Sequence, residues 1–198
     1  AADDPIPRML PALRALTEWF AEKQTPYLVI GGIAITLVAR ARATRDIDAV
    51  VLIDESDPLG FISSGASFGF FPRESNALER ARASRMMLLT HRPSGISIDI
   101  SLGGIAFEHE SVARAVTVRA GGVDIRVPRA EDLIIMKAVA ARPVDIGDID
   151  GLLDMHPNVD RTFIRAAVIE FAKLLERPEI VTTLEPLLKA KRLPMDPE

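Results

Sequence analysis

Residues 27–53 decide the fold, and they read YLVIGGIAITLVARARATRDIDAVVLI. The segment opens with four apolar residues, as a buried strand does, and the pair Gly31 and Gly32 follows them directly. Residues 33–41 can continue as a short helix, and the unpaired backbone N–H groups of a helix's first turn attract anions. Glycine at such a turn lets a phosphate approach the backbone closely. We therefore expect a phosphate site at the glycine pair.

A second strand carries two carboxylates. Thirteen residues separate Gly32 from Asp46, and residues 46–53 are apolar except for Asp46 and Asp48. Side chains two residues apart in a strand lie on the same face of the sheet. The spacing therefore predicts that Asp46 and Asp48 point the same way.

A third carboxylate comes from a later strand. Residues 96–101 alternate between apolar and polar, as a strand with one buried face does, and Asp99 is on the polar side. If this strand lies beside residues 46–53, the carboxylates are about 5 Å apart, and each pair repels by about 3 kcal/mol at an effective dielectric constant near 20. A divalent cation or protonation must relieve this repulsion. Mg²⁺ prefers oxygen ligands and is commonly held by carboxylates together with substrate phosphates, so the pattern favours Mg²⁺ with a nucleotide.

The composition limits the classes of protein. With 198 residues and 48% hydrophobic content the chain can bury a core as one domain, or as one domain with a small appendage. The absence of cysteine excludes a disulfide scaffold, zinc held by thiolates and thiol catalysis, and it fits a reducing compartment. The N-terminus lacks the basic and apolar regions of a secretory signal, so we expect a cytoplasmic protein.

The charge and hydropathy of the chain limit the kinds of partner that it can bind. The longest uncharged apolar stretch, residues 27–39, has thirteen residues, fewer than the roughly 20 that a membrane span needs. We therefore expect no membrane association. The net charge of −4 argues against a nucleic acid that wraps the protein, but it permits local contacts to a polyanion through arginines such as Arg42 and Arg45.

The period of the hydrophobic residues changes along the chain. An amphipathic helix is expected over residues 6–24 and two hairpins over 86–101 and 115–127, whereas 54–72 has no clear period and is expected to be loop and short helix. Beyond Pro128 the pattern is helical, over residues 130–141, 145–155, 160–175 and 180–190. The sequence thus predicts an α/β fold, with a core over 1–128 that includes the N-terminal helix and a C-terminal helical segment over 129–198 packed on it.

These motifs carry a family resemblance. Ile30-Gly31-Gly32 followed by Asp46-Ile47-Asp48-Ala49 resembles the signature of the nucleotidyltransferase superfamily, whose catalytic domain is shared with DNA polymerase beta. Asp99 stands in the place of the family's third carboxylate. The resemblance implies that residues 1–128 are the catalytic core, a twisted mixed β-sheet flanked by helices.

The resemblance also implies a mechanism. Two Mg²⁺ ions, or Mn²⁺ in their place, would bridge Asp46, Asp48 and the triphosphate of an NTP such as ATP. Asp99 would hold the catalytic metal and help to deprotonate an acceptor hydroxyl, which then receives the NMP. The residues that the resemblance assigns to nucleotide binding are Gly31, Gly32, Arg42, Thr44, Arg45, Lys137, Arg142 and Asp145.

A second stretch suggests a subgroup. It is similar to small bacterial relatives of the AbiEii-type toxins of type IV toxin–antitoxin systems, on the residues Pro128, Glu131, Asp132, Leu133, Lys137, Ala140, Arg142, Asp145, Asp148 and Ile149. A toxin of this kind implies an antitoxin partner. Its acceptor could be an RNA such as tRNA, a protein or a small molecule, and the sequence leaves these three open.

Two rival functions stay open as well. The chain could be an inactive binding or regulatory module on the same scaffold, similar to an antitoxin, or an antibiotic-modifying nucleotidyltransferase. For single residues the structural alternative is equally strong, because Lys137 could extend along an apolar helix face and Arg142 could simply pair with Asp145.

A serine hydrolase is disfavoured. Residues 65–69 match the Gly-x-Ser-x-Gly pattern, but the pattern needs a strand before it and a helix after it. No strand is expected before Ser67, and Pro72 would hinder the helix.

Overall fold

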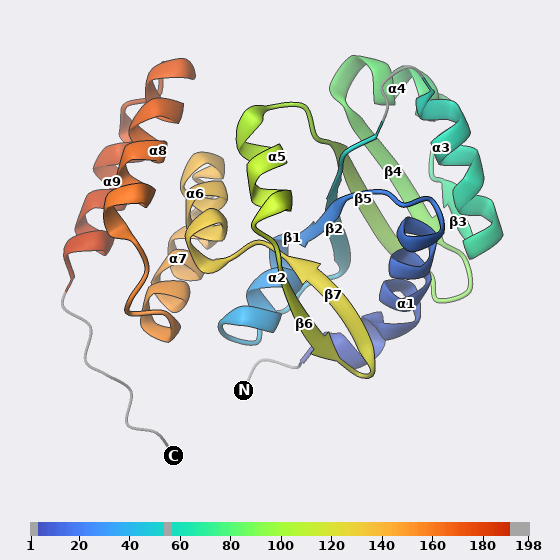
Figure 1. Cartoon of the computed structure of the whole chain (residues 1–198), viewed down its shortest axis with the longest axis horizontal. Helices are drawn as coiled ribbons and strands as arrows, with labels where there is room; N and C mark the ends of the chain where they lie inside the picture. The colour runs from blue at the N-terminus through green and yellow to red at the C-terminus, as the bar shows by residue number, and fades with distance from the viewer. Residues whose placement is uncertain (1–3, 54–56, 191–198) are drawn as a thin grey trace. The chain divides into compact units, whose positions relative to one another are not determined.

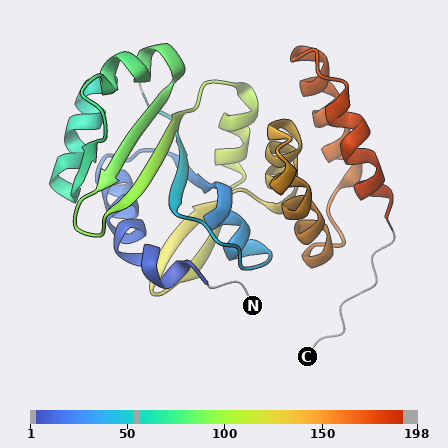
Figure 2. The same cartoon turned by 180° about the vertical axis from the view of Figure 1, so that it is seen from behind.

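The computed structural model describes residues 4–53 and 57–190. The chain divides into two compact units, of which the first comprises residues 1–37 and 41–128 and the second comprises 38–40 and 129–198. Figures 1 and 2 show the elements of each unit from opposite sides. No helix in the described ranges is both long and apolar enough to cross a membrane.

The first unit is a mixed sheet with helices, which confirms the predicted α/β fold. Its helical elements are α1 (Ile6–Glu22), α2 (Gly31–Val38), α3 (Pro58–Ser64), the 3₁₀ helix η1 (Gly65–Phe68), α4 (Ala77–Ser84) and α5 (Ala106–Ala113). Its strands are β1 (Tyr27–Ile30), β2 (Asp46–Val51), β3 (Phe70–Pro72), β4 (Met86–His91), β5 (Ile96–Leu102), β6 (Val116–Ala120) and β7 (Val123–Val127).

Five strands form the main sheet, in the order β1-β2-β5-β4-β3. β2 and β5 pair in parallel, and the other neighbours pair antiparallel. The predicted hairpin over residues 86–101 is confirmed as β4 and β5, and the strand that carries Asp99 lies beside the strand that carries Asp46 and Asp48. The second hairpin, β6 and β7, forms a separate two-stranded sheet.

An aromatic cluster packs the edge strand β3 against the N-terminal helix α1. The Trp19 ring of α1 stacks at 4.7 Å on Phe61 of α3 and at 5.3 Å on Phe70 of β3, measured between ring centroids. The Trp19 indole Nε1 donates a hydrogen bond of 2.8 Å to Ser64 Oγ. Trp19 is fully buried, and aromatic pairs at these distances add to the stabilisation from burial.

The strand β3 corrects the expectation of loop for residues 54–72. It has three residues and contains Pro72, and it lies at the edge of the described sheet beside β4, where the missing proline N–H is tolerated. Residues 54–56 lie outside the described residues. α3 and η1 account for most of the remainder, and α3 and α4 lie beside β3 and β4 in both views (Figures 1 and 2).

The second unit is helical, and it confirms the four predicted helices. They are α6 (Ala130–Ala140), α7 (Pro143–Met155), α8 (Arg161–Leu174) and α9 (Glu179–Lys189). α7 begins two residues earlier than expected, at Pro143, because the first turn of a helix has no use for the missing proline N–H. The segment 38–40 belongs to this unit, where His156 Nε2 lies 2.6 Å from the Val38 carbonyl oxygen and donates to it.

A buried ion network joins α6 to α7. Lys137 Nζ lies 2.9 Å from Asp145 Oδ1 and 2.9 Å from Asp148 Oδ2, and the three side chains are 4%, 1% and 6% exposed. Arg142 Nε, Arg142 Nη2 and the Arg142 backbone N–H all donate to the Asp145 carboxylate. Burial raises the pKa of Asp145, but the hydrogen bonds from Arg142 and Lys137 outweigh burial and hold that pKa below its ordinary value. Asp145 is therefore ionised at neutral pH and binds both cations.

We predict that Lys137→Met destabilises the fold by about 3–5 kcal/mol, since it removes the cation between two buried carboxylates. The measurement is the free energy of unfolding from urea denaturation monitored by circular dichroism. Lys189→Met is the matched control, because Lys189 is 73% exposed and pairs only with Glu185 among the described residues. The control should change the free energy by less than about 0.5 kcal/mol, and equal losses for both variants would contradict a special role for Lys137.

We predict a pH dependence of stability from His91. The side chain is 4% exposed, packs its ring 5.0 Å from Phe70 and places Nδ1 2.7 Å from Ser94 Oγ. Burial lowers the pKa of His91, so the unfolded chain takes up the proton first, near pH 6.5, and the free energy of unfolding falls as the pH drops through that value.

Urea denaturation at about pH 7.5 and about pH 5.5 tests this, with His91→Gln expected to lose part of the pH dependence. His109→Gln is the control, because His109 is exposed, and it should keep the wild-type dependence. An unchanged pH dependence in His91→Gln would rule out His91 as its source.

Candidate active site

The three predicted carboxylates share one face of the main sheet. In the parallel pair β2 and β5, Asp48 is the direct register partner of Asp99, and Asp46 is the partner of Ser97. Burial alternates along β5, where the isoleucines are buried and Asp99 is partly exposed, as the sequence predicts. Asp46 and Asp48 are also partly exposed. The structure therefore brings Asp48 and Asp99 side by side, with Asp46 two residues away on the same face.

The glycine pair makes room for side chains of this site. Gly31 has φ of +64°, and a Cβ there would lie 2.0 Å from Asp48 Oδ2. A Cβ on Gly32 would lie 2.8 Å from Thr44 Cβ and 3.3 Å from Arg42 Nη2. The sequence predicted that the glycines clear a space for phosphate. In the structure, Asp48, Thr44 and Arg42 pack against them, so the pair sets the positions of these side chains.

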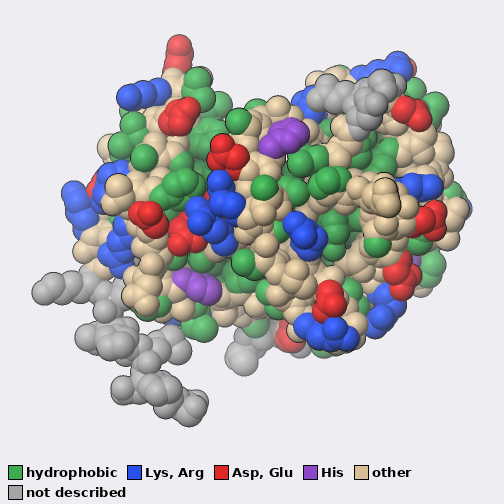
Figure 3. Space-filling model, in the orientation of Figure 1, with side chains coloured by type: hydrophobic (Ala, Val, Ile, Leu, Met, Phe, Trp, Pro, Cys, Tyr) green, Lys and Arg blue, Asp and Glu red, His purple; other side chains and the backbone are tan. Residues whose placement is uncertain are grey.

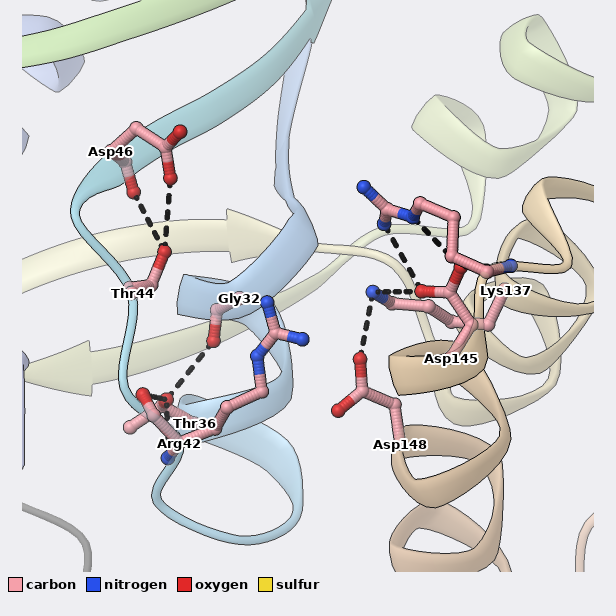
Figure 4. A network of polar contacts seen from close by, with 9 residues as sticks. Gly32, Thr36, Arg42, Thr44, Asp46, Lys137, Asp145 and Asp148 are labelled. Carbon is pink, nitrogen blue, oxygen red and sulfur yellow. Dashed lines mark hydrogen bonds and ion pairs between the residues drawn. The ribbon is translucent and has the colours of Figure 1, made fainter.

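The segment before β2 orients Asp46. Thr44 Oγ1 donates a hydrogen bond of 3.0 Å to Asp46 Oδ1, one of the two contacts drawn between these residues in Figure 4. Arg8 Nη2 of α1 donates to the Thr44 backbone oxygen at 3.0 Å. Arg45, the remaining predicted contact in this segment, is exposed. The contact of Arg8 could not be predicted, because nothing in the α1 pattern connects it to a residue 36 positions later.

Asp99 has a partner that no local sequence pattern predicts. Arg73, which directly follows β3, donates from Nη2 to Asp99 Oδ1 and forms an ion pair with it. The backbone N–H of Arg73 donates to the Leu88 oxygen at 2.9 Å, and Leu88 is the register partner of Asp99. A guanidinium therefore lies beside the carboxylate that belongs, by resemblance, to the catalytic metal.

The carboxylates suit a cation that keeps other ligands. Within residues 4–53 and 57–190, no three His, Cys, Asp or Glu side chains lie close enough to hold a metal ion by themselves. Asp46 accepts from Thr44, and Asp99 accepts from Arg73. All three carboxylates are nevertheless accessible, and their oxygens are the donors that Mg²⁺ takes when it also binds water and substrate phosphate. The donor set fits Mg²⁺ with a nucleotide and does not form an all-protein cage.

The residues of the second unit that were predicted to bind nucleotide bind one another in the structure. Lys137, Arg142 and Asp145 belong to the ion network between α6 and α7, and Figure 4 shows Lys137 between Asp145 and Asp148. Lys137 Nζ is buried there and bound to two carboxylates. The structural alternative is thus what these contacts show, while a role of Lys137, Arg142 or Asp145 in nucleotide binding stays a prediction.

The Gly-x-Ser-x-Gly pattern forms no hydrolase site in the described residues. Ser67 of the Gly-x-Ser-x-Gly pattern lies in η1, between α3 and β3, so the strand–turn–helix that a hydrolase needs is absent at this position. Acidic and basic side chains are interspersed over the face drawn in Figure 3.

Comparisons with known proteins bear on the family and the fold of this chain. Residues 88–185 match the family model described as "Nucleotidyl transferase of unknown function (DUF2204)". No curated protein is similar enough in sequence to count as a match.

Among solved structures, that of the antibiotic-resistance factor ANT(2'')-Ia covers 86% of this chain and 95% of its own, with 16% identity and a TM-score of 0.57. An antigenic nucleotidyltransferase-like protein from Paracoccidioides brasiliensis covers 92% and 93%, with 15% identity and a TM-score of 0.48. The lincosamide antibiotic adenylyltransferase LnuA covers 71% and 93%, with 16% identity and a TM-score of 0.48.

At such low identity the likeness to ANT(2'')-Ia establishes the fold, and the finer resemblance to AbiEii-type toxins stays a prediction. Residues 88–185 thus match a family of nucleotidyl transferases, and the chain has the fold of a nucleotidyltransferase.

Proposed function

We propose that this protein is a Mg²⁺-dependent enzyme that transfers an NMP from an NTP to an acceptor hydroxyl, with release of pyrophosphate. The observation that carries the proposal is the register of Asp48 with Asp99, beside a glycine whose missing Cβ leaves space for the Asp48 carboxylate. Asp48 and Asp99 are partly exposed and adjacent across parallel strands, so their carboxylates repel each other in the absence of a cation, which favours a metal site over an inactive scaffold.

Each residue of the site has a proposed role. Asp46, Asp48 and Asp99 would hold Mg²⁺, which would supply positive charge to neutralise the triphosphate and the attacking oxygen. Thr44 fixes the orientation of Asp46 through its hydroxyl. Arg42, at the glycine pair, and the exposed Arg45 contact the triphosphate. Most of the rate would come from positioning and charge neutralisation, since phosphoryl transfer asks little covalent chemistry of the protein.

The acceptor has two candidates. The similarity of residues 128–149 to AbiEii-type toxins favours a toxin that modifies an RNA such as tRNA or a protein, and that is held in check by an antitoxin. The fold shared with the antibiotic-resistance factor ANT(2'')-Ia favours a small-molecule antibiotic instead, as an analogy of fold alone. We place the toxin first, because the similarity rests on particular residues of this chain.

We predict that the protein, given Mg²⁺ and each labelled NTP in turn, moves label onto an acceptor in a cell extract or onto an aminoglycoside. The class of molecule that gains label separates the two candidates. Asp48→Asn should reduce labelling at least about a hundredfold, because it removes a cation ligand. Asp124→Asn is the control, since Asp124 is 58% exposed on β7 and pairs with Arg119. Labelling that survives Asp48→Asn would refute the mechanism.

We predict that Gly31→Ala impairs labelling more than stability. The left-handed φ of +64° costs alanine about 1–2 kcal/mol, and its Cβ must displace the Asp48 carboxylate, which lies 2.0 Å away. Gly147→Ala is the matched control, because nothing lies within 4 Å of a Cβ there and alanine favours the helix α7. Labelling and melting temperature are measured for both variants, and a Gly31→Ala protein that labels at the wild-type rate would contradict the proposed placement of Asp48.

A further inference from the structure

Arg73 binds the Asp99 carboxylate, which the proposed reaction needs as a ligand for a cation. Its guanidinium Nη2 binds Asp99 Oδ1, and the two side chains are 31% and 28% exposed. The position of Arg73 is fixed by the sheet, because its backbone N–H extends the pairing of β3 with β4 and donates to Leu88. Arg73, Leu88, Asp99 and Asp48 therefore form a row across neighbouring strands.

The charges along this row explain the contact. Asp48 and Asp99 face each other in register, and a nearby cation lowers their repulsion. Without a metal ion the guanidinium of Arg73 can serve as that cation. A metal ion at the same carboxylate would compete with Arg73 for oxygen lone pairs and would meet its positive charge.

Because the ion pair of Arg73 and Asp99 is partly exposed, another cation can displace Arg73 from it. A buried ion pair resists separation, because each charge would be left desolvated, as for Lys137 in the network between α6 and α7. Arg73 and Asp99 keep about a third of their side-chain surface in water, so the separated guanidinium regains its hydration easily. The contact is thus strong enough to orient Asp99 and weak enough to break.

We infer that Arg73 is a positioning residue that holds Asp99 in the cation-free protein and releases it when a divalent cation binds. This inference rests on the proposed function, because it takes Asp99 as a metal ligand. It adds a residue outside the resemblance, and it predicts that Arg73 opposes cation binding when no nucleotide is present.

The test is the affinity for Mn²⁺ alone, measured by electron paramagnetic resonance with purified full-length protein. Arg73→Gln should bind Mn²⁺ about two- to fivefold more tightly than wild type, the effect expected from loss of one partly exposed ion pair. Arg73→Lys keeps the positive charge and should stay close to wild type. Asp99→Asn should bind more weakly, and in that background Arg73→Gln should change nothing further.

Arg80→Gln is the matched control, because the ion-pair partner of Arg80 in the described residues is Glu74, at 2.7 Å, and not Asp99. It removes the same charge and should leave Mn²⁺ affinity unchanged. If Arg73→Gln binds Mn²⁺ no better than wild type, or if Arg80→Gln gains as much, the inference is overturned.

A second measurement tests the contact without any metal. A double-mutant cycle of Arg73→Gln and Asp99→Asn, followed by melting temperature in the presence of EDTA, should show that the two substitutions are not additive. Additive effects would overturn the role of Arg73, because the side chains would then be energetically independent.

The outcomes separate this inference from the proposed function. If the Mn²⁺ affinities follow the expected order but no NTP label is transferred, the proposed activity fails and the role of Arg73 stands. If label is transferred and depends on Asp48 while Arg73→Gln leaves Mn²⁺ affinity unchanged, the activity stands and the role of Arg73 fails. If no variant binds Mn²⁺, both the metal site and this inference fall.

Discussion

The mutual repulsion of Asp48 and Asp99 is the constraint around which the first unit is organised. Their strands run in parallel and in register, so the sheet itself forces the two carboxylates together. The surrounding residues then limit what this costs. Gly31 provides space for one carboxylate, Arg73 supplies a counter-charge to the other, and both side chains keep access to water. The repelling carboxylates do not stabilise the sheet, whereas the aromatic cluster around Trp19 stabilises its edge.

In the second unit, the charged side chains are buried and neutralise one another. Lys137 lies between Asp145 and Asp148 with almost no exposure, and Arg142 closes the network from the end of α7. A fully compensated network of this kind specifies how α6 and α7 pack, because any other packing would leave a charge unsatisfied. The same residue types that are accessible around Asp99 are enclosed here, which makes the first arrangement suited to exchange of partners and the second to rigidity.

Much of the fold could be predicted from local patterns, and part of the site could not. The glycine pair, the Asp46 strand and the alternation around Asp99 are signals of a few residues each, and they fixed the shared face of the three carboxylates correctly. Arg73 and Arg8 carry no such signal, because they reach the site only through tertiary pairing. β3 was missed for a related reason, since a three-residue edge strand is too short to have a period. For Lys137, periodicity placed the residue on the correct helix but could not tell phosphate from carboxylate as its partner.

The short strand β3 links the packing of the hydrophobic interior to the position of a charged side chain. One of its ends is Phe70, which stacks on Trp19 of the N-terminal helix, and just beyond the other end is Arg73, which holds Asp99. A change in the hydrophobic interior near Trp19 would therefore shift the reach of a guanidinium toward the carboxylates, with no polar residue altered. Under the proposed function, natural variation in that interior would alter the metal-ion preference of proteins whose acidic residues are all intact.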